Sequence, residues 1–343
     1  MIELNIAVVG TGSIVDEFCI AVGMIKDMNV VALYSRDIKS ARVKELKETY
    51  KITWLFESLD TMLACENIDT VYIASPNSLH YSQSLSALNA NKHVICEKPF
   101  TSTYIEACHL LDVAKKKQLM IFEAITTLYL PNFQIIKENL FRIGKLRIAM
   151  LNYSQYSRKY DRFLAGHLPN VFNCEFSGGC LQDINIYNVH FMTALFGIPG
   201  VCEYFPNIHE NGIDTSGIMI MQYPGFTATL TGSKDTRSEN FVYLQGEKGY
   251  IKVLNGSNGC QEVIIELTGE ETRKLNSQYE SNRLFYELQA FSEMFTGNDT
   301  KRCYELIEYS ANVVKLVENA RIKAGVHFAA DHTPLNVQTT LNS

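Results

Sequence analysis

The chain has 343 residues, a length that predicts two domains at roughly 100–200 residues per domain. Its composition, 46% hydrophobic and 20% charged, is close to that of globular proteins and excludes a disordered, collagen-like or coiled-coil chain. The net charge of −6 would repel a phosphate backbone, and Lys115–Lys117 is the only basic run in the sequence, so we expect no nucleic-acid partner.

Cysteine usage and the start of the sequence bear on the compartment. The 9 cysteines form an odd set without a C-x-x-C pair or a metal-like spacing with histidine, which indicates a reduced, cytoplasmic chain without a metal site. The first residues lack a basic segment followed by an apolar one, and no stretch approaches about 18 uninterrupted apolar residues. We therefore expect neither secretion nor association with a membrane.

The first 123 residues alternate short apolar runs with amphipathic stretches, the pattern of a parallel sheet covered by helices. The predicted strands are Ile6–Val9, Val30–Tyr34, Val71–Ala74, His93–Cys96 and Met120–Glu123. The predicted helices are Ile14–Lys26, Ile38–Tyr50, Leu59–Cys65, Ser78–Asn91 and Thr103–Lys117. Right-handed crossovers between such strands give a doubly wound sheet, so residues 1–123 are expected to form a dinucleotide-binding Rossmann domain.

After Glu123 the strand-like runs follow one another through short turns such as Tyr223-Pro224-Gly225. These strands are Lys145–Ser154, Ile213–Tyr223, Phe226–Thr231, Asn240–Gln245, Tyr250–Leu254 and Glu262–Leu267. The predicted helices are Phe133–Phe141, Leu181–Phe196, Leu284–Thr296 and Tyr304–Ala324. The pattern predicts an α+β domain over 124–330 with a mostly antiparallel, open sheet, followed by a polar, loosely held tail at 331–343.

A glycine-rich turn separates the first predicted strand from the first helix. Gly10 permits the tight turn, and Gly12 lets the backbone approach a pyrophosphate, whose charge is favoured at the helix start formed by Ser13 and Ile14. Val15 replaces the third glycine of the usual fingerprint. In this strand–turn–helix context the motif favours dinucleotide binding over a generic tight turn.

The second predicted strand ends in Ser35-Arg36-Asp37, where the residue that recognises the adenosine ribose is expected. An acidic residue at position 35 would bind a 2′-hydroxyl, whereas a small hydroxyl followed by arginine suits a 2′-phosphate. We therefore expect NADP to be preferred over NAD. The alternative is that Arg36 is a solvated residue and that Asp37 caps the next helix.

Two more loops leave strands at the carboxyl edge of the sheet, where ligands bind in open α/β folds. Ser75 and Asn77 follow the third strand, and His80 beyond them is either a partly buried helix residue or a ligand contact. Glu97-Lys98-Pro99 follows the fourth strand. Its lysine is either a surface charge or an ammonium beside the cofactor, where a lowered pKa would let it donate to a substrate oxygen.

The second domain offers one more candidate, in the predicted helix Leu181–Phe196. At about 100° per residue, Asp183, Tyr187 and His190 fall within roughly a 60° arc of an otherwise apolar helix. A carboxylate, a phenol and an imidazole on one face can line a pocket, or they can form a solvated surface.

These segments together resemble the Gfo/Idh/MocA oxidoreductases, the family of glucose–fructose oxidoreductase and inositol dehydrogenase. The resemblance covers nearly the whole chain. It depends on Gly10-x-Gly12, on Val71–Asn77 with His80, on Asn91–Pro99, and on Gly178-Gly179 followed by Asp183.

The resemblance implies a Rossmann domain and a C-terminal domain whose open sheet often forms a dimer interface. It also implies that Lys98 lies beside the nicotinamide. Tyr187 holds a position where the family has histidine or tyrosine, and tyrosine is similar to the dihydrodiol dehydrogenase and glucose–fructose oxidoreductase branch. Asn185 stands where the family commonly has glycine, a departure expected to narrow the pocket. Some relatives have lost activity, so the fold alone does not establish turnover.

The resulting hypothesis is an NAD(P)-dependent oxidoreductase that moves a hydride between the nicotinamide and a secondary alcohol or carbonyl of a sugar, polyol or diol. Tyr187 would relay the proton, Lys98 would lower the tyrosine pKa and polarise the substrate oxygen, and Asp183 would orient the substrate or the lysine. The alternatives are a catalytically silent NAD(P)-binding sensor and a different nucleotide-binding α/β enzyme, which would leave Glu97-Lys98-Pro99 unexplained.

The substrate side is less defined in the sequence. A polar, aromatic stretch could line the substrate or could equally form the rim of a dimer; its members are Tyr153, Tyr156, Arg158, Tyr160, Asp161 and Arg162. We take Tyr156 and Arg158 from this stretch as candidate substrate-binding residues, together with Lys98, Asp183 and Tyr187.

Overall fold

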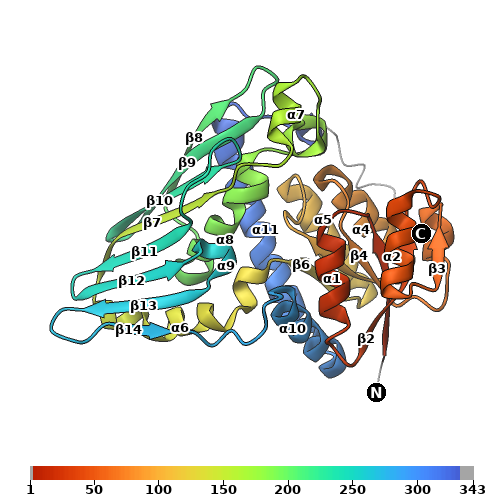
Figure 1. The fold of residues 1–343 in the computed structure, drawn as a ribbon, viewed down its shortest axis with the longest axis horizontal. Helices are drawn as coiled ribbons and strands as arrows, with labels where there is room; N and C mark the ends of the chain where they lie inside the picture. Colours follow the sequence, from red (N-terminus) through yellow and green to blue (C-terminus); the bar gives the residue numbers. More distant parts are fainter. Residues whose placement is uncertain (1–2, 333–343) are drawn as a thin grey trace.

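Two sheets organise the chain into two lobes in the computed structural model, which describes residues 3–332 (Figure 1). The first sheet is wholly parallel, with strand order β3-β2-β1-β4-β5-β6. Its strands are β1 (Leu4–Val9), β2 (Met28–Tyr34), β3 (Trp54–Phe56), β4 (Thr70–Ile73), β5 (His93–Glu97) and β6 (Ile121–Ala124). The order reverses between β1 and β4, which is the switch point where ligands bind in such sheets.

Helices cover both faces of this sheet, as the apolar strand sequences predict. They are α1 (Ile14–Val22), α2 (Ala41–Tyr50), α3 (Leu59–Leu63), α4 (His80–Asn89) and α5 (Tyr104–Lys117). In β1, Ile6 and Val8 join the core on one face, while Ala7 and Val9 join the core on the other. The predicted doubly wound Rossmann architecture is confirmed.

The second sheet has eight strands in the order β14-β13-β12-β11-β7-β10-β9-β8. Their bounds are β7 (Leu146–Ser154), β8 (Val201–Ile208), β9 (Asp214–Tyr223), β10 (Phe226–Ser233), β11 (Phe241–Gly246), β12 (Gly249–Leu254), β13 (Glu262–Leu267) and β14 (Arg273–Leu275). Every neighbouring pair is antiparallel except β7 and β10, so the mostly antiparallel sheet expected from the sequence is confirmed.

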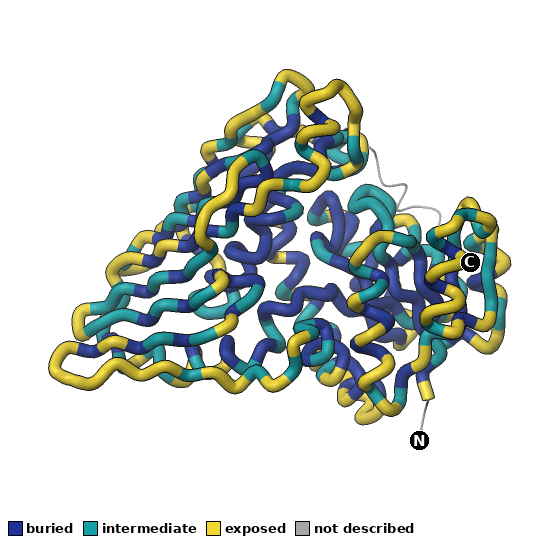
Figure 2. The backbone as a smooth tube through the Cα atoms, in the orientation of Figure 1, coloured by how far each residue is buried: buried dark blue, intermediate teal, exposed yellow. Residues whose placement is uncertain are grey.

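One face of this sheet packs against α6 (Pro131–Asn139) and α8 (Ile186–Phe196), whose side chains share its core. The other face is open and carries exposed apolar side chains. Strand register places Ile148, Met150, Ile218 and Phe205 on that face. Figure 2 shows buried stretches between the two sheets and exposed hairpin ends along the outer edge of the second sheet.

The last two long helices join the lobes. Leu288 and Phe291 of α10 (Leu284–Gly297) lie in the core of the first lobe. In α11 (Thr300–Lys323), Ile307 packs on the first sheet, whereas Val317 packs on the second. Helices α10 and α11, predicted as the end of the second domain, therefore fix the two lobes to each other. The domain boundary predicted at 123/124 remains a prediction.

Several boundaries differ from the prediction for local reasons. Helix α2 begins at Ala41 rather than Ile38, because the Ser40 hydroxyl accepts a hydrogen bond from the Val43 amide at 3.4 Å and so caps the helix. The prediction missed three strands. β3 and β14 span three residues each, too few to show alternation, and edge strand β8 contains Pro206.

The predicted tail is also corrected at its start. Asp331 is not loosely held, because its carboxylate forms an ion pair with the buried Arg321 and accepts a hydrogen bond from the Phe328 amide at 2.8 Å. The rest of the predicted tail, 333–343, lies outside the described residues. Within residues 3–332, no helix has both the length and the apolar character needed to cross a bilayer.

Candidate active site

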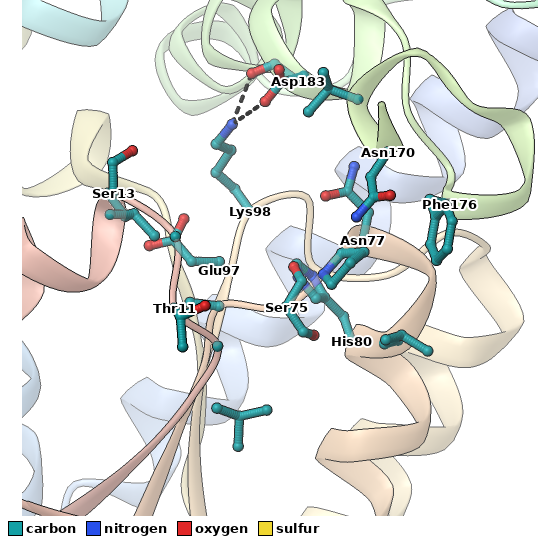
Figure 3. Close-up of a pocket in the computed structure, with 18 of the residues that line it drawn as sticks. Thr11, Ser13, Ser75, Asn77, His80, Glu97, Lys98, Asn170, Phe176 and Asp183 are labelled. Atoms are coloured by element: carbon teal, nitrogen blue, oxygen red, sulfur yellow. Dashed lines mark hydrogen bonds and ion pairs between the residues drawn. The ribbon is translucent and has the colours of Figure 1, made fainter. Parts of the chain in front are cut away.

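A cavity of about 1030 Å³ lies between the lobes, at the carboxyl ends of the parallel strands (Figure 3). The first lobe lines it through the loops that follow β1, β2, β4 and β5. The second lobe contributes side chains from the end of β7 and the segment that follows it, from the helical segment that leads into α8, and from the residue before α10. These are Tyr153, Gln155, Lys159, Asn170, Val171, Phe176, Asp183, Ile184, Tyr187 and Arg283.

The glycine-rich turn has the shape that a dinucleotide requires. Gly10 has φ +123°, and a Cβ there would lie 2.4 Å from the carbonyl oxygen of Ala74, so only glycine fits. Gly12 lines the cavity, and a Cβ on it would meet no atom within 4 Å. The open space over Gly12, at the start of α1, fits a pyrophosphate held by backbone amides and the helix N-terminus.

The end of the cavity formed by the loop after β2 contains Ser35 and Arg36, the residues predicted to recognise the ribose. The Ser35 hydroxyl accepts a hydrogen bond from the Asp37 amide at 3.3 Å, and Asp37 in turn accepts from the Lys39 amide at 3.1 Å. Asp37 therefore orders the turn and does not cap α2. Arg36 is exposed, and no described residue forms an ion pair with it, which leaves its guanidinium open to an anionic group.

The loop after β4 is held by hydrogen bonds to the protein itself. Asn77 donates through Nδ2 to the carbonyl oxygen of Ser177 at 2.8 Å and so joins the lobes. The Ser75 hydroxyl donates to Gln83 at 2.7 Å. His80 is buried, with Nδ1 2.9 Å from the Pro99 carbonyl and Nε2 3.0 Å from the Ser75 carbonyl, and burial lowers its pKa. Of the two alternatives, the structure favours a buried helix histidine.

Glu97 and Lys98 leave β5 in different directions. The Glu97 carboxylate is buried and accepts a hydrogen bond from the Tyr72 hydroxyl at 2.7 Å, and burial raises its pKa. The Lys98 ammonium crosses to the second lobe, where it donates to the Asp183 backbone oxygen at 2.8 Å and to Asp183 Oδ1 at 3.0 Å (Figure 3). It also lies 5.0 Å from the centroid of the Tyr187 ring.

The prediction of a lowered Lys98 pKa is wrong. Burial acts in that direction, but Tyr187 in its ionised form and the carboxylates of Asp183 and Glu97 outweigh it and raise the pKa above its ordinary value. Lys98 is therefore a fixed cation that donates hydrogen bonds, and it does not release its proton near neutral pH.

A second lysine, Lys234, was not expected from the sequence. It follows β10 and is buried, and its ammonium forms an ion pair with Asp183 Oδ2 and donates to the Val171 carbonyl oxygen at 3.3 Å. Burial alone would raise the Asp183 pKa, but Lys234 and Lys98 hold it far below its usual range. Asp183 therefore connects two ammonium groups. Gly232-Ser233-Lys234-Asp235 resembles an ordinary turn, so no local pattern marks this lysine as buried.

Replacing Lys234 with Met tests the structural side of this arrangement. Removing one partner of a buried ion pair lowers the free energy of unfolding by roughly 3–5 kcal/mol. Because Lys98 still pairs with Asp183, we expect the smaller loss, about 3 kcal/mol. Urea unfolding measures it. The exposed pair of Lys301 and Glu305 supplies the control, since Lys301→Met should change the free energy of unfolding by less than about 0.5 kcal/mol. Equal effects of both substitutions would contradict the role given to Lys234.

Tyr187 is buried beside these charges, and its hydroxyl has no hydrogen-bond partner among residues 3–332. Its ring makes an edge contact with Tyr153 at 5.7 Å, and the Arg283 guanidinium lies 5.9 Å from its centroid. Burial raises the pKa of Tyr187 to about 12, while Lys98 and Arg283 act to lower it. Near neutral pH this side chain is an uncharged phenol.

The helix that presents Asp183 and Tyr187 is not regular. Leu181–Asn185 form a π-helical turn before α8, so positions do not advance by about 100° per residue. Asp183 and Tyr187 line the cavity, as expected, but His190 turns away, with Nδ1 3.2 Å from the Tyr309 hydroxyl and Nε2 3.6 Å from Glu123.

Asn185 does not narrow the cavity as expected. It is fully buried, donates through Nδ2 to the Leu230 carbonyl oxygen at 3.0 Å and accepts from Asn188 at 2.8 Å. A Cβ on Gly232 would lie 2.7 Å from the Asn185 Cβ, so a glycine on β10 accommodates this asparagine.

The polar, aromatic stretch that begins at the end of β7 divides between two cavities. Tyr153 and Gln155 line both the interlobe cavity and a neighbouring one, whereas Tyr156 lines only the neighbouring one and donates its hydroxyl to Asp161 at 2.6 Å. Arg158 is exposed and lines neither, so the structure does not bring this predicted substrate-binding residue to the site.

Comparison with known proteins relates this geometry to a family. Residues 4–125 match the oxidoreductase family with an NAD-binding Rossmann fold, and residues 136–252 match the GFO/IDH/MocA C-terminal domain. The chain is 34% identical to the uncharacterized oxidoreductase YgjR of Escherichia coli (strain K12), over 97% of this chain and 100% of that protein. It is 33% identical to the scyllo-inositol 2-dehydrogenase (NADP(+)) IolU of Bacillus subtilis (strain 168), over 96% and 99% of the two chains.

Solved structures agree on the fold. KijD10, a 3-ketoreductase from Actinomadura kijaniata solved with NADP and TDP-benzene, superposes with a TM-score of 0.82 at 22% identity, covering 95% of this chain and 98% of that one. Levoglucosan dehydrogenase, solved with NADH and levoglucosan, gives a TM-score of 0.80 at 15% identity, covering 94% and 97%. The resemblance noted from sequence motifs is confirmed, and the chain belongs to the Gfo/Idh/MocA family of NAD(P)-binding oxidoreductases.

Proposed function

We propose that this protein is an NADP-preferring oxidoreductase that interconverts a secondary alcohol and its carbonyl on a sugar, polyol or diol. The observation that carries the proposal is Tyr187, a buried residue that lines the cavity containing the glycine-rich turn. Its hydroxyl has no hydrogen-bond partner among the described residues, and the Lys98 ammonium lies 5.0 Å from the centroid of its ring. Two relatives support the substrate class: the scyllo-inositol 2-dehydrogenase IolU and the trans-1,2-dihydrobenzene-1,2-diol dehydrogenase of Mus musculus, which is 28% identical over 96% of this chain and 99% of that protein.

The first lobe would hold the dinucleotide through Gly10–Gly12 and the start of α1, with Ser35 and Arg36 at the ribose. When bound, the nicotinamide supplies or accepts the hydride. Ser75, Asn77 and His80 shape the same side of the cavity mainly through contacts with the protein itself. Their predicted role as cofactor contacts remains a prediction.

The proton would pass through Tyr187. With a pKa of about 12 the phenol stays protonated near neutral pH, so it can donate to the substrate oxygen when a carbonyl is reduced. Lys98 would stabilise the negative charge that develops on that oxygen, and it lowers the pKa of the phenol relative to burial alone. Asp183 accepts from Lys98 and Lys234 and would fix the direction in which the Lys98 ammonium points.

A turnover assay tests this proposal. Purified protein is incubated with NADPH and a panel of aldoses, ketoses and α-diketones, and in reverse with NADP⁺ and polyols, while the reduced nicotinamide is followed by absorbance. Oxidation of NADPH by at least one member supports the proposal. Tight NADPH binding without turnover across the panel would overturn it in favour of a sensor that binds the cofactor without reaction.

Cofactor preference gives a separate prediction. If Arg36 contacts the 2′-phosphate, Arg36→Ala should raise the Kd for NADPH about tenfold, equivalent to about 1.4 kcal/mol, and leave the Kd for NADH nearly unchanged. Fluorescence titration of the reduced cofactors measures both constants. Lys39→Ala removes a neighbouring exposed charge that does not line the cavity and serves as control. A similar loss for both cofactors would count against 2′-phosphate recognition.

The open sheet face supports a proposal about assembly. Ile148, Met150, Phe205 and Ile218 are each at least 39% exposed on one face, where a second copy would cover them. We propose a homodimer or larger homo-oligomer through this face, and a cytoplasmic location, which the nine unpaired cysteines support.

A further inference from the structure

A second cavity, of about 1220 Å³, adjoins the interlobe cavity on the side of the second lobe. The two share Glu17, Tyr153, Gln155 and Arg283 in their walls. The first cavity must accommodate a dinucleotide, and ligand sites span roughly 300–1,000 Å³ in most proteins. The second cavity therefore offers room for a ligand part that extends away from the reacting carbon.

A chain of hydrogen bonds forms the boundary between the cavities. The Arg283 guanidinium donates to Asn258 Oδ1, and Asn258 Nδ2 donates to the Tyr153 hydroxyl at 2.7 Å. Tyr153 and Arg283 also pack against the Tyr187 ring. A substrate whose carbon reacts at Tyr187 would therefore pass these fixed side chains to reach the second cavity.

Carboxamide groups are the main polar feature of this cavity. Asn240 and Asn276 each use Oδ1 for the fold, accepting from the Ser154 and Gln278 amides at 2.8 and 3.0 Å, and their Nδ2 groups have no partner among residues 3–332. The side chains of Asn255 and Gln261 are likewise unengaged within the described chain. A carboxamide offers a donor and an acceptor side by side, which matches a pair of neighbouring hydroxyls.

Aromatic and charged residues complete the lining. Tyr156 and Tyr279 are 40% and 68% exposed and present ring surface, which suits the apolar face of a sugar ring. The formal charges of the wall balance, because it contains two arginines, Arg237 and Arg283, and two glutamates, Glu17 and Glu280. Arg283 also donates to Asn258. Such a wall favours a neutral polyhydroxylated ligand over a phosphorylated one.

We propose that the second cavity is a subsite for a second, neutral sugar ring, so that the physiological substrate is a glycoside or disaccharide. This inference rests on the proposed function, because it places the oxidised ring at Tyr187. The predicted contribution of Tyr156 to substrate binding then applies to this second ring.

Calorimetric titration of the NADP⁺-saturated protein tests the subsite. The probes are single rings and their extended partners: glucose with cellobiose and maltose, galactose with lactose, and myo-inositol with galactinol. We expect at least one extended sugar to bind about tenfold more tightly than its parent ring. In Asn276→Ala and Tyr279→Ala the ratio of the two Kd values should fall to about one. Gln289→Ala, an exposed amide of α10 that lines neither cavity, should keep the wild-type ratio.

Equal Kd values for every pair, or a gain that survives in both variants, would overturn the subsite. Tighter binding of UDP-glucose than of every neutral disaccharide would overturn the neutral class. NADPH formation measured in parallel separates the two proposals. A disaccharide that binds with the expected gain and is not oxidised supports the subsite and counts against the proposed function. Turnover of single rings with no gain in affinity for extended sugars supports the proposed function and counts against the subsite. A panel in which no sugar binds overturns the subsite and the proposed function together.

Discussion

Replacing Lys98 with Met is expected to lower kcat by several orders of magnitude while leaving the Kd for NADP nearly unchanged. Methionine keeps the approximate shape of the side chain and removes the charge. The ammonium acts on two groups, since it would stabilise charge on the substrate oxygen and it lowers the Tyr187 pKa. Removing one donor from an oxyanion site costs about 10²–10³ in kcat, and the change in the phenol adds to that loss. Turnover assays and fluorescence titration of NADP measure the two quantities.

The control for this variant is Lys116→Met, at an exposed lysine of α5 that does not line the cavity, which should change neither quantity. Lys98→Arg adds a finer test. Its charge is retained, but a planar guanidinium does not reproduce the two contacts of 2.8 and 3.0 Å to Asp183, so most of the loss should persist. Equal losses in kcat and in NADP affinity would place Lys98 in cofactor binding alone.

The fold could be predicted largely because both sheets obey simple periodicities. The continuous apolar run of β1 indicates a strand covered on both faces, and β9 alternates buried and exposed positions as a strand covered on one face. The strands that the sequence pattern missed, β3, β8 and β14, lie at the edges of the two sheets. Strand β8 contains Pro206, and only its pairing with β9 shows that Val201–Ile208 is extended. The sequences of α10 and α11 resemble those of ordinary amphipathic helices. That they pack on both lobes could not be predicted, because it depends on contacts between residues distant in the sequence.

The site was predictable to the extent that its residues follow strands. Lys98 comes directly after β5, so the topology alone places it at the carboxyl edge of the sheet, and Asp183 meets it there. Lys234 could not be found in this way, because nothing in the local sequence shows that this lysine is buried. Its burial is explained only by its ion pair with Asp183, which is distant in the sequence. The π-helical turn was equally hidden, and it changes the angle between Asp183 and the residues of α8. His190 lies in α8 with Tyr187 and turns away because it contacts Tyr309 and Glu123, which the sequence pattern does not show.

Replacing Tyr187 with Phe is expected to reduce kcat by about 10²–10⁴, the usual contribution of a positioned acid or base, with little change in KM. The substitution is a clean test of chemistry, because no described residue hydrogen-bonds the hydroxyl and the ring contacts with Lys98 and Tyr153 remain. The free energy of unfolding should therefore change by less than about 0.5 kcal/mol. Tyr243→Phe on β11, which lines neither cavity, should change neither kcat nor stability.

The pH profile distinguishes a proton-transfer role for Tyr187 from a merely structural one. Burial raises its pKa to about 12, so the phenol that protonates a carbonyl is fully populated only well below that value, which includes neutral pH. Carbonyl reduction by the wild type should be independent of pH near neutrality and fall only as the pH approaches 12. Alcohol oxidation needs the phenolate, so its rate should rise about tenfold per pH unit over the same range. Tyr187→Phe should lose both dependences, and a variant that kept the wild-type profiles at reduced rate would show that another group carries the proton.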